Sequence, residues 1–116
     1  RISLLAGGKM QYVPVDSILY LEQKNHTVFV HTMGGVIRTS QTVKLSQLEV
    51  LLPHPPFMRC HQSFIVNLRH VRFLDKELKT FDMADGGKVY IRRQEIRNAA
   101  KAYEDELFRA ARGGKA

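Results

Sequence analysis

The sequence contains a single cysteine and no long run of apolar residues, and both shortages exclude classes of protein. Cys60 alone cannot form an internal disulfide or a thiolate-rich zinc site, so we expect a reducing, cytoplasmic setting. No stretch approaches the roughly 18 apolar residues that a membrane-spanning helix needs. Residues 1–15 lack the pattern of a signal peptide, and the chain begins with Arg1. We therefore expect a water-soluble domain cut from a longer protein.

Acidic residues are scarce relative to basic ones. Eleven Asp and Glu oppose 18 Lys and Arg in 116 residues, which gives a net charge of +7 and a pI near 9.9. Such an excess favours a polyanionic partner, with nucleic acid first and an anionic membrane surface second. Residues 59–116 hold thirteen basic and eight acidic residues, a net of +5, so this half is expected to supply most of the partner surface. The length fits one domain.

The secondary structure is expected to be mainly β. Short β-branched and aromatic runs, separated by turn residues, predict an antiparallel meander of strands over residues 2–5, 10–15, 18–23, 27–32 and 36–40. Gly34 and Gly35 suit the hairpin turn that precedes the last of these strands. Further strands are predicted from residue 57 and over residues 71–74, 78–81 and 88–91.

Two helices are expected between and after these strands. Leucines at helical spacing predict a helix over residues 43–52, with Thr42 as its N-cap and Pro53 ending it. Apolar residues at steps of three or four predict a second helix over residues 94–112.

Three separated motifs carry the most specific signal. Residues 57–68 read FMRCHQSFIVNL. Apart from its second and last positions, the segment consists of Phe, Arg, a small apolar residue, His, a polar residue, Ser, an aromatic residue, two aliphatic residues and Asn, in that order. This segment resembles the signature of LytTR domains, the DNA-binding output modules of a class of bacterial response regulators. Residues 18–26 (ILYLEQKNH) and 88–93 (KVYIRR) are similar to two further signatures of that family. The resemblance covers about residues 2–99.

The resemblance implies a fold and a mode of action. The fold would be mainly β with short helices, an elongated β-β-β arrangement of short antiparallel sheets. Loops between strands, rather than a recognition helix, would enter successive major grooves of promoter DNA. The full-length protein would bind paired repeats as a dimer under an upstream receiver domain of a two-component system. We expect residues 1–99 to form the LytTR-like domain and residues 100–116 a helical extension.

The loops of the three motifs offer side chains that suit bases and phosphates. Arg is suited to guanine, Asn and Gln to adenine, and Lys to phosphate. The predicted DNA-binding residues are Lys24, Asn25, His26, Arg59, His61, Gln62, Ser63, Arg92 and Arg93. Two alternatives stay open, because His61 could instead fix its turn through the backbone and Ser63 could cap it rather than contact a phosphate. Arg92 stands where the family usually has Ser.

Other polar residues are expected to be structural. Cys60 and His61 are adjacent on a strand and face opposite ways, so they cannot form a nucleophile-base pair, and a buried, inert thiol is predicted. Asn67 is expected to satisfy backbone groups of a turn. No ligand spacing predicts a metal site, and we expect no cofactor and no catalysed reaction.

A small basic RNA-binding or protein-interaction module is the alternative function. RNA-binding modules use exposed aromatic side chains to stack bases. Tyr12, Tyr20, Phe29 and Phe73 instead stand in strand patterns that are compatible with the core, and the polar loops carry the cations, which favours duplex DNA.

Overall fold

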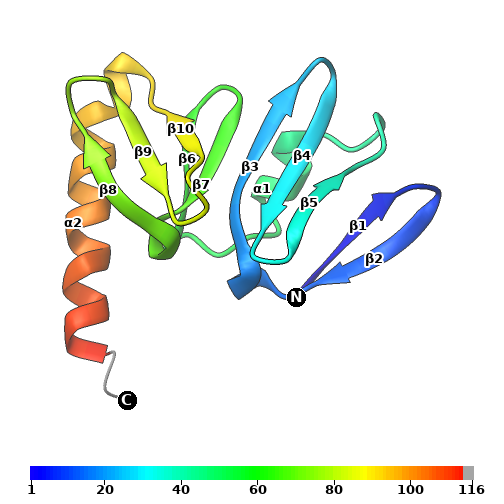
Figure 1. The fold of residues 1–116 in the computed structure, drawn as a ribbon, viewed down its shortest axis with the longest axis horizontal. Coiled ribbons are helices and arrows are strands. Elements are labelled where there is room, and N and C mark those ends of the chain that lie inside the picture. Colours follow the sequence, from blue (N-terminus) through cyan, green and yellow to red (C-terminus); the bar gives the residue numbers. More distant parts are fainter. Residues whose placement is uncertain (114–116) are drawn as a thin grey trace.

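A computed structural model describes residues 1–113, which form three antiparallel sheets and two α-helices (Figure 1). The strands are β1 (Ile2–Ala6), β2 (Lys9–Val13), β3 (Ile18–Lys24), β4 (Thr27–Thr32), β5 (Gly35–Arg38), β6 (Phe57–His61), β7 (Phe64–Asn67), β8 (Val71–Asp75), β9 (Thr80–Met83) and β10 (Lys88–Tyr90). The helices are α1 (Leu45–Glu49) and α2 (Ile96–Gly113), with short 3-10 helices at Val15–Ser17, Leu68–His70 and Arg93–Glu95. The predicted fold class, mainly β with short antiparallel sheets, is confirmed.

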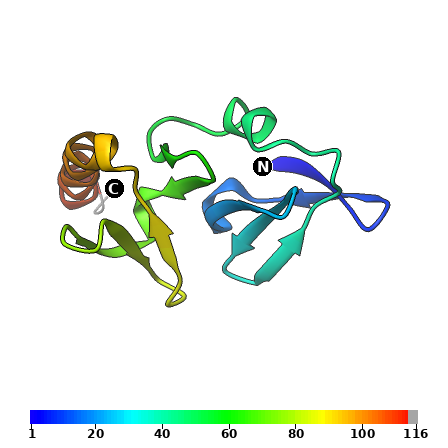
Figure 2. The same cartoon turned by 90° about the horizontal axis from the view of Figure 1, so that it is seen from above.

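The central layer is the five-stranded sheet, in the order β5-β4-β3-β7-β6. The hairpin β1–β2 and α1 cover one of its faces, and β8 to β10 with α2 cover the other (Figure 2). Ile18 and Leu21 of β3 belong to the first core, whereas Leu19 and Tyr20 belong to the second. Because both faces are buried there, β3 begins with four consecutive apolar residues, 18–21, instead of an alternating pattern.

The first helix is shorter than predicted and starts differently. It spans Leu45–Glu49, and Lys44, not Thr42, is its N-cap. The Lys44 amide donates to Gln47 Oε1 at 3.0 Å, while the Thr42 hydroxyl lies 3.0 Å from that of Ser40. A side chain already engaged in the preceding turn leaves capping to the residue nearer the helix.

Two strand boundaries also differ from the predicted ones. β9 begins at Thr80 because the Leu78 amide donates to Asp75 Oδ1 at 2.9 Å, so the residues predicted to start the strand form a turn. Gly35 lies in β5 and pairs with Thr32. The hairpin turn is therefore Met33 and Gly34.

The core prediction is wrong for two of the four aromatic residues. Tyr20 is 5% exposed, but Tyr12 is 63% and Phe73 is 49% exposed. Tyr12 lies on β2, whose outer face has no layer over it, and the Arg1 guanidinium lies 5.0 Å from its ring. Strand periodicity is the same whether or not a second layer covers a face.

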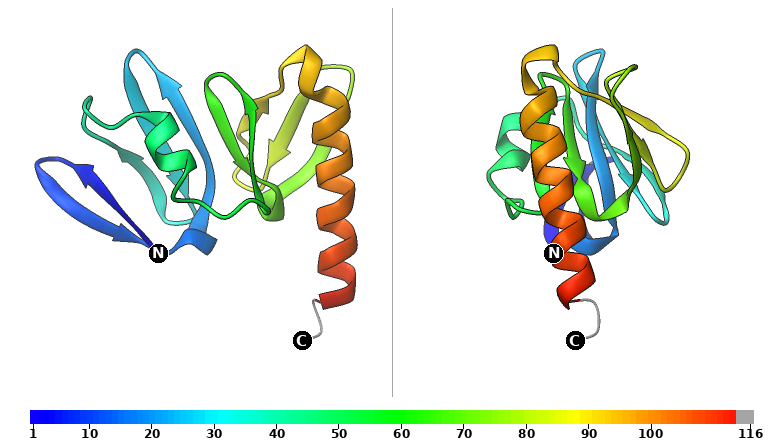
Figure 3. Two further views of the ribbon diagram at one scale, coloured as in Figure 1. Left: turned by 180° about the vertical axis from the view of Figure 1, so that it is seen from behind. Right: turned by 90° about the vertical axis from the view of Figure 1, so that its left-hand side faces the viewer.

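The two ends of the molecule differ in what they present. The β3–β4 turn, the β6–β7 turn and the start of α2 lie at one end, whereas the N-terminus and the end of α2 lie at the other (Figures 1 and 3). α2 continues through residues 99 and 100, and Ala99 is buried in the second core. The predicted division after residue 99 stays a prediction, and its residues 114–116 lie outside the described part. Neither helix of residues 1–113 is long and apolar enough to cross a membrane.

Candidate nucleic-acid interface

Backbone hydrogen bonds hold the three motif loops together at one end of the molecule. The Gln23 amide at the end of β3 donates to the Ser63 carbonyl in the β6–β7 turn at 2.9 Å. The Arg92 amide, just after β10, donates to the Cys60 carbonyl of β6, also at 2.9 Å. The β6–β7 hairpin is therefore bonded to β3 on one side and to the segment after β10 on the other, and its turn lies at the same end of the molecule as the β3–β4 turn and the start of α2 (Figure 1).

The β3–β4 turn is tight and its backbone is unusual. Lys24 pairs with Thr27, which leaves Asn25 and His26 as the two central residues, with φ of 51° and 64°. Positive φ at both positions is the geometry of a type I′ turn, whose twist matches that of the flanking strands. Asn tolerates this conformation well and His less so. Lys24, Asn25 and His26 are all exposed.

Arg59 on β6 donates three hydrogen bonds to other residues of the protein. Its Nε donates to the His61 carbonyl at 3.1 Å and its Nη2 to the Gln62 carbonyl at 2.6 Å. Its Nη1 donates to Glu49 Oε1 at the end of α1, at 2.7 Å. The half-buried guanidinium thus bonds two carbonyl groups at the β6–β7 turn. Contact of Arg59 with DNA stays a prediction, and this geometry favours a positioning role.

The geometry of His61 favours the alternative in which its side chain fixes the β6–β7 turn by bonding the backbone. Its Nδ1 accepts a hydrogen bond from the Ser63 amide at 3.0 Å, and its ring packs edge-on against Phe64 with centroids 5.6 Å apart. Burial lowers the pKa of His61, and the positive charges of Arg92 and Arg59 lower it further. A neutral imidazole is the form that can accept from an amide.

Two neighbouring hollows run between the motif loops. One, of about 540 Å³, is lined by Gln23, Asn25, His26, Arg59, Gln62 and Ser63. The next, of about 360 Å³, is lined by Arg59, His61, Gln62, Arg92 and Glu95. Arg59 and Gln62 belong to both, so the middle turn separates them. Lys24 and Arg93 line neither hollow, and both are exposed.

The sequence prediction missed the acidic partners of this surface. Glu95 lines the second hollow and Glu49 holds Arg59. Glu95 lies only two residues after Arg93, so its position next to a motif could have indicated it. Glu49 lies ten residues before Arg59 and belongs to no motif, so only the fold reveals the pair.

Two residues predicted to be structural are confirmed as such. Cys60 is fully buried, its Sγ donates to the Tyr90 carbonyl at 3.5 Å, and burial raises the pKa of its thiol to about 12. The Asn67 amide donates to the Ile18 carbonyl at 2.8 Å, and its Oδ1 accepts from the Arg69 amide at 3.0 Å. Within residues 1–113, no three His, Cys, Asp or Glu side chains gather as a metal site would require.

Comparisons with known proteins point to one family. The family model described as "LytTr DNA-binding domain" matches residues 8–104. The CO-responsive transcriptional regulator RcoM of Rhodospirillum rubrum is 32% identical over 100 residues, which are 83% of this chain and 42% of that protein. Accessory gene regulator protein A of Staphylococcus aureus is 33% identical over 79 residues, 66% of this chain and 31% of that protein.

A solved structure agrees with these sequence matches. It is the LytTr DNA-binding domain of a putative methyl-accepting/DNA response regulator from Bacillus cereus, with a TM-score of 0.73 and 28% identity. The match covers 87% of this chain and 94% of that one. The chain therefore spans nearly the whole of a solved domain but less than half of the curated regulators.

Proposed function

The chain belongs to the LytTr DNA-binding domain family, whose members bind promoter DNA and regulate transcription, and we propose that this chain does so through its three motif segments. In this proposal the segments read successive major grooves of a promoter site. The supporting observation is the backbone bonding that joins the three motif turns at one end of the molecule. Their exposed Lys, Asn, His, Gln and Arg side chains can bond both base edges and phosphates.

The turns divide the work in this proposal. Arg93 and Gln62 are exposed and read base edges, Arg93 through guanine and Gln62 through adenine. His26 and Asn25 present a base-reading pair on the rigid β3–β4 turn. Lys24 and Arg92 neutralise phosphates, with Ser63 donating a hydroxyl beside them.

Arg59 and His61 act on DNA indirectly. Each bonds the backbone of the β6–β7 turn, so each sets where Gln62 and Ser63 lie. We assign them as positioning residues.

The proposal also includes a regulatory domain outside this chain. The curated relatives are more than twice the length of the part that matches, which supports a regulatory domain elsewhere in the protein. In this proposal a cytoplasmic receiver domain controls pairing of two copies on repeated sites. The domain carries out no reaction itself.

The experiment begins by selecting bound duplexes from a random pool with the domain of residues 1–116, which yields a cognate site. Affinities of Arg93→Ala, Gln62→Ala and Lys24→Ala are then measured on the cognate and on a random duplex by fluorescence anisotropy. Loss of a base contact should cost about 1–3 kcal/mol on the cognate site and much less on random DNA. Lys24→Ala should weaken both duplexes alike.

Competitors and salt test the class of partner. Affinity for duplex DNA should fall steeply between low and moderate salt, because phosphate neutralisation releases counterions. Single-stranded RNA and anionic vesicles should compete weakly. Equal losses on both duplexes for Arg93→Ala, or stronger competition by RNA, would contradict readout of duplex bases by these turns.

A further inference from the structure

The end of α2 exposes apolar side chains that the rest of the described chain does not cover. From Leu107 to Gly113 every residue is exposed, with Leu107 at 52% and Phe108 at 66%. Figure 3 shows these last turns extending past the sheets. Single exposed apolar residues are ordinary, but here they adjoin a groove.

The groove lies between α2 and the chain from residue 68 to residue 76. A hollow of about 670 Å³ has an apolar lining of Leu68, Val71, Leu107 and Ala110. A second hollow, of about 860 Å³, continues along the same helix and is lined by Phe73, Leu74 and Tyr103 among others. Leu107 lines both, so the two hollows adjoin each other along α2, and together we call them the α2 groove.

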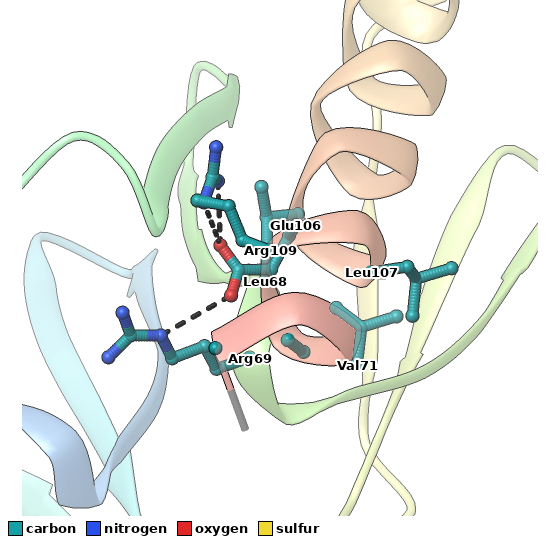
Figure 4. A pocket seen from close by; sticks show the side chains of 8 residues that line it. Leu68, Arg69, Val71, Glu106, Leu107 and Arg109 are labelled. Atoms are coloured by element: carbon teal, nitrogen blue, oxygen red, sulfur yellow. Dashed lines mark hydrogen bonds and ion pairs between the residues drawn. The ribbon is translucent and has the colours of Figure 1, made fainter. Parts of the chain in front are cut away.

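A buried carboxylate fixes two cations at one end of the α2 groove. Glu106 is only 4% exposed, and its Oε1 accepts from Arg109 Nε at 3.2 Å and Nη2 at 2.7 Å. Its Oε2 accepts from Arg69 Nε at 3.3 Å (Figure 4). The side chains of Arg69 and Arg109 remain 55% and 46% exposed, so both guanidinium groups can still donate outward. Held in place by Glu106, they lose little freedom when they bind an anion.

The charge around the groove is mostly positive. Five cations line the two hollows against two carboxylates, Glu104 and Glu106. The cations are Arg69, Lys76, Arg97, Lys101 and Arg109. Glu106 pairs with Arg69 and Arg109, and Lys101 Nζ lies 3.0 Å from Asp105 Oδ1. With Asp105 included, three carboxylates stand against the five cations, which leaves a net of +2. An apolar floor with basic rims is complementary to a segment with an apolar stripe and acidic flanks.

We propose that the α2 groove binds an acidic amphipathic helix of a partner protein. The lining residues run along α2 from Arg97 to Gly113, about 24 Å at 1.5 Å per residue, which accommodates a helix of about four turns. Such a helix would place its apolar stripe on Leu107 and Val71 and its carboxylates against the rims. The groove lies on residues that the DNA-reading turns do not use, so the domain can hold DNA and this partner together.

The test titrates a designed probe into the isotope-labelled domain of residues 1–116 and follows amide chemical shifts. The probe is a 16-residue helical peptide with Leu at i, i+3, i+4 and i+7 and Glu at the flanking positions. A second peptide replaces each Glu with Lys, and a third scrambles the acidic sequence. Only the acidic amphipathic peptide should bind, with shifts at residues 68–76 and 97–113. Saturating duplex DNA should leave its affinity unchanged.

Matched variants separate the groove from charge alone. Leu107→Glu should weaken the acidic peptide by about tenfold or more, because it places a carboxylate on the apolar floor. Val50→Glu makes the same change at an 81% exposed residue outside the groove and should have no effect. Lys101→Glu should weaken binding several-fold, and both groove variants should bind DNA as the parent does.

Three outcomes would overturn the proposal. Shifts at residues 24–26, 62 and 92–93 would mean that the peptide only imitates DNA at the turns. Equal binding of the acidic and basic peptides would remove the charge argument. Shifts at residues 97–113 that depend on protein concentration without peptide would mean that a second copy covers the groove. Failure of DNA binding leaves this result untouched, because the two sites are measured separately.

Discussion

Glu49 Oε1 lies 2.7 Å from Arg59 Nη1, and this pair connects the end of α1 to the turn between β6 and β7. Two more of the five N–H groups of Arg59 donate to the carbonyls of His61 and Gln62. The carboxylate therefore fixes the guanidinium that in turn fixes the backbone under Gln62. An acidic residue next to a DNA-binding surface would ordinarily only repel phosphate.

Glu49→Gln distinguishes these two effects. If Glu49 acts through Arg59, the variant should bind the cognate duplex about five- to tenfold more weakly, the cost of about 1 kcal/mol for a weakened charge-assisted hydrogen bond. If it only repels phosphate, the variant should bind every duplex more tightly. Anisotropy titrations on cognate and random DNA decide. Glu77→Gln, at an exposed residue of the β8–β9 turn, is the charge-matched control.

His26→Gly should stabilise the domain while weakening DNA binding. The imidazole-bearing residue holds φ at 64°, a conformation that costs a side-chain-bearing residue roughly 1–2 kcal/mol and glycine almost nothing. Glycine also has greater conformational freedom in the unfolded chain, which offsets part of this stabilisation. The free energy of unfolding should therefore rise by up to about 1 kcal/mol. Urea unfolding measures it. Asn25→Gly, where Asn already tolerates φ of 51°, should gain less, and an equal or larger gain there would contradict the argument.

The stability of the domain should fall in mild acid through His61. Burial and then the charges of Arg92 and Arg59 hold the pKa of His61 below its ordinary 6.5. The unfolded chain therefore binds more protons, so the free energy of unfolding decreases as pH drops below 6.5 and through the folded-state pKa. The Ser63 amide donates to Nδ1, so its resonance should shift with the same midpoint as the ring.

An NMR titration of the imidazole and the Ser63 amide measures this directly. His61→Gln removes the titrating group, so its unfolding free energy should fall less than that of the parent between pH 7.5 and 5.5. A His61 midpoint at or above 6.5 would contradict the predicted sign.

Gly87→Ala should destabilise the contact between the β9–β10 hairpin and the central sheet. A Cβ at Gly87 would overlap the hydroxyl of Tyr20, whose ring is stacked on His31 with centroids 4.0 Å apart. Overpacking of this kind costs typically 1–3 kcal/mol. Thermal and urea unfolding measure the loss, and adding Tyr20→Phe should recover part of it. Gly34→Ala, whose Cβ meets only Thr32 Oγ1 at 3.9 Å, is the control and should be nearly neutral.

The three motifs predicted the family and the fold class because each is local, whereas the DNA-reading residues that they suggest stay a prediction. Lys24 ends β3, Asn25, His26 and Gln62 stand in turns, and Arg93 begins a 3-10 helix, and each belongs to a motif that is contiguous in sequence. The short strands around them follow from β-branched runs and turn residues in the same way. These features do not depend on which sheets and helices pack against each other in the fold.

Features that depend on a second element were missed. The pairing of Glu49 with Arg59 joins a helix to a strand, and no periodicity encodes it. The exposure of Tyr12 and Phe73 depends on whether a layer covers their strands, which alternation cannot reveal. The cap of α1 moved to Lys44 because Thr42 bonds Ser40 in the preceding turn.

The two backbone hydrogen bonds between the three motif segments also constrain the spacing of the proposed DNA-reading side chains. The bonds from Gln23 to Ser63 and from Arg92 to Cys60 link the three motif segments, so we expect their separations to change little when a site of different length is offered. Each base pair adds about 3.4 Å to a duplex, more than a hydrogen-bonded frame yields. In the proposed function, DNA that binds would therefore adjust its own bend and twist to the protein, and sequences that deform easily between the contacted bases would gain affinity without being touched.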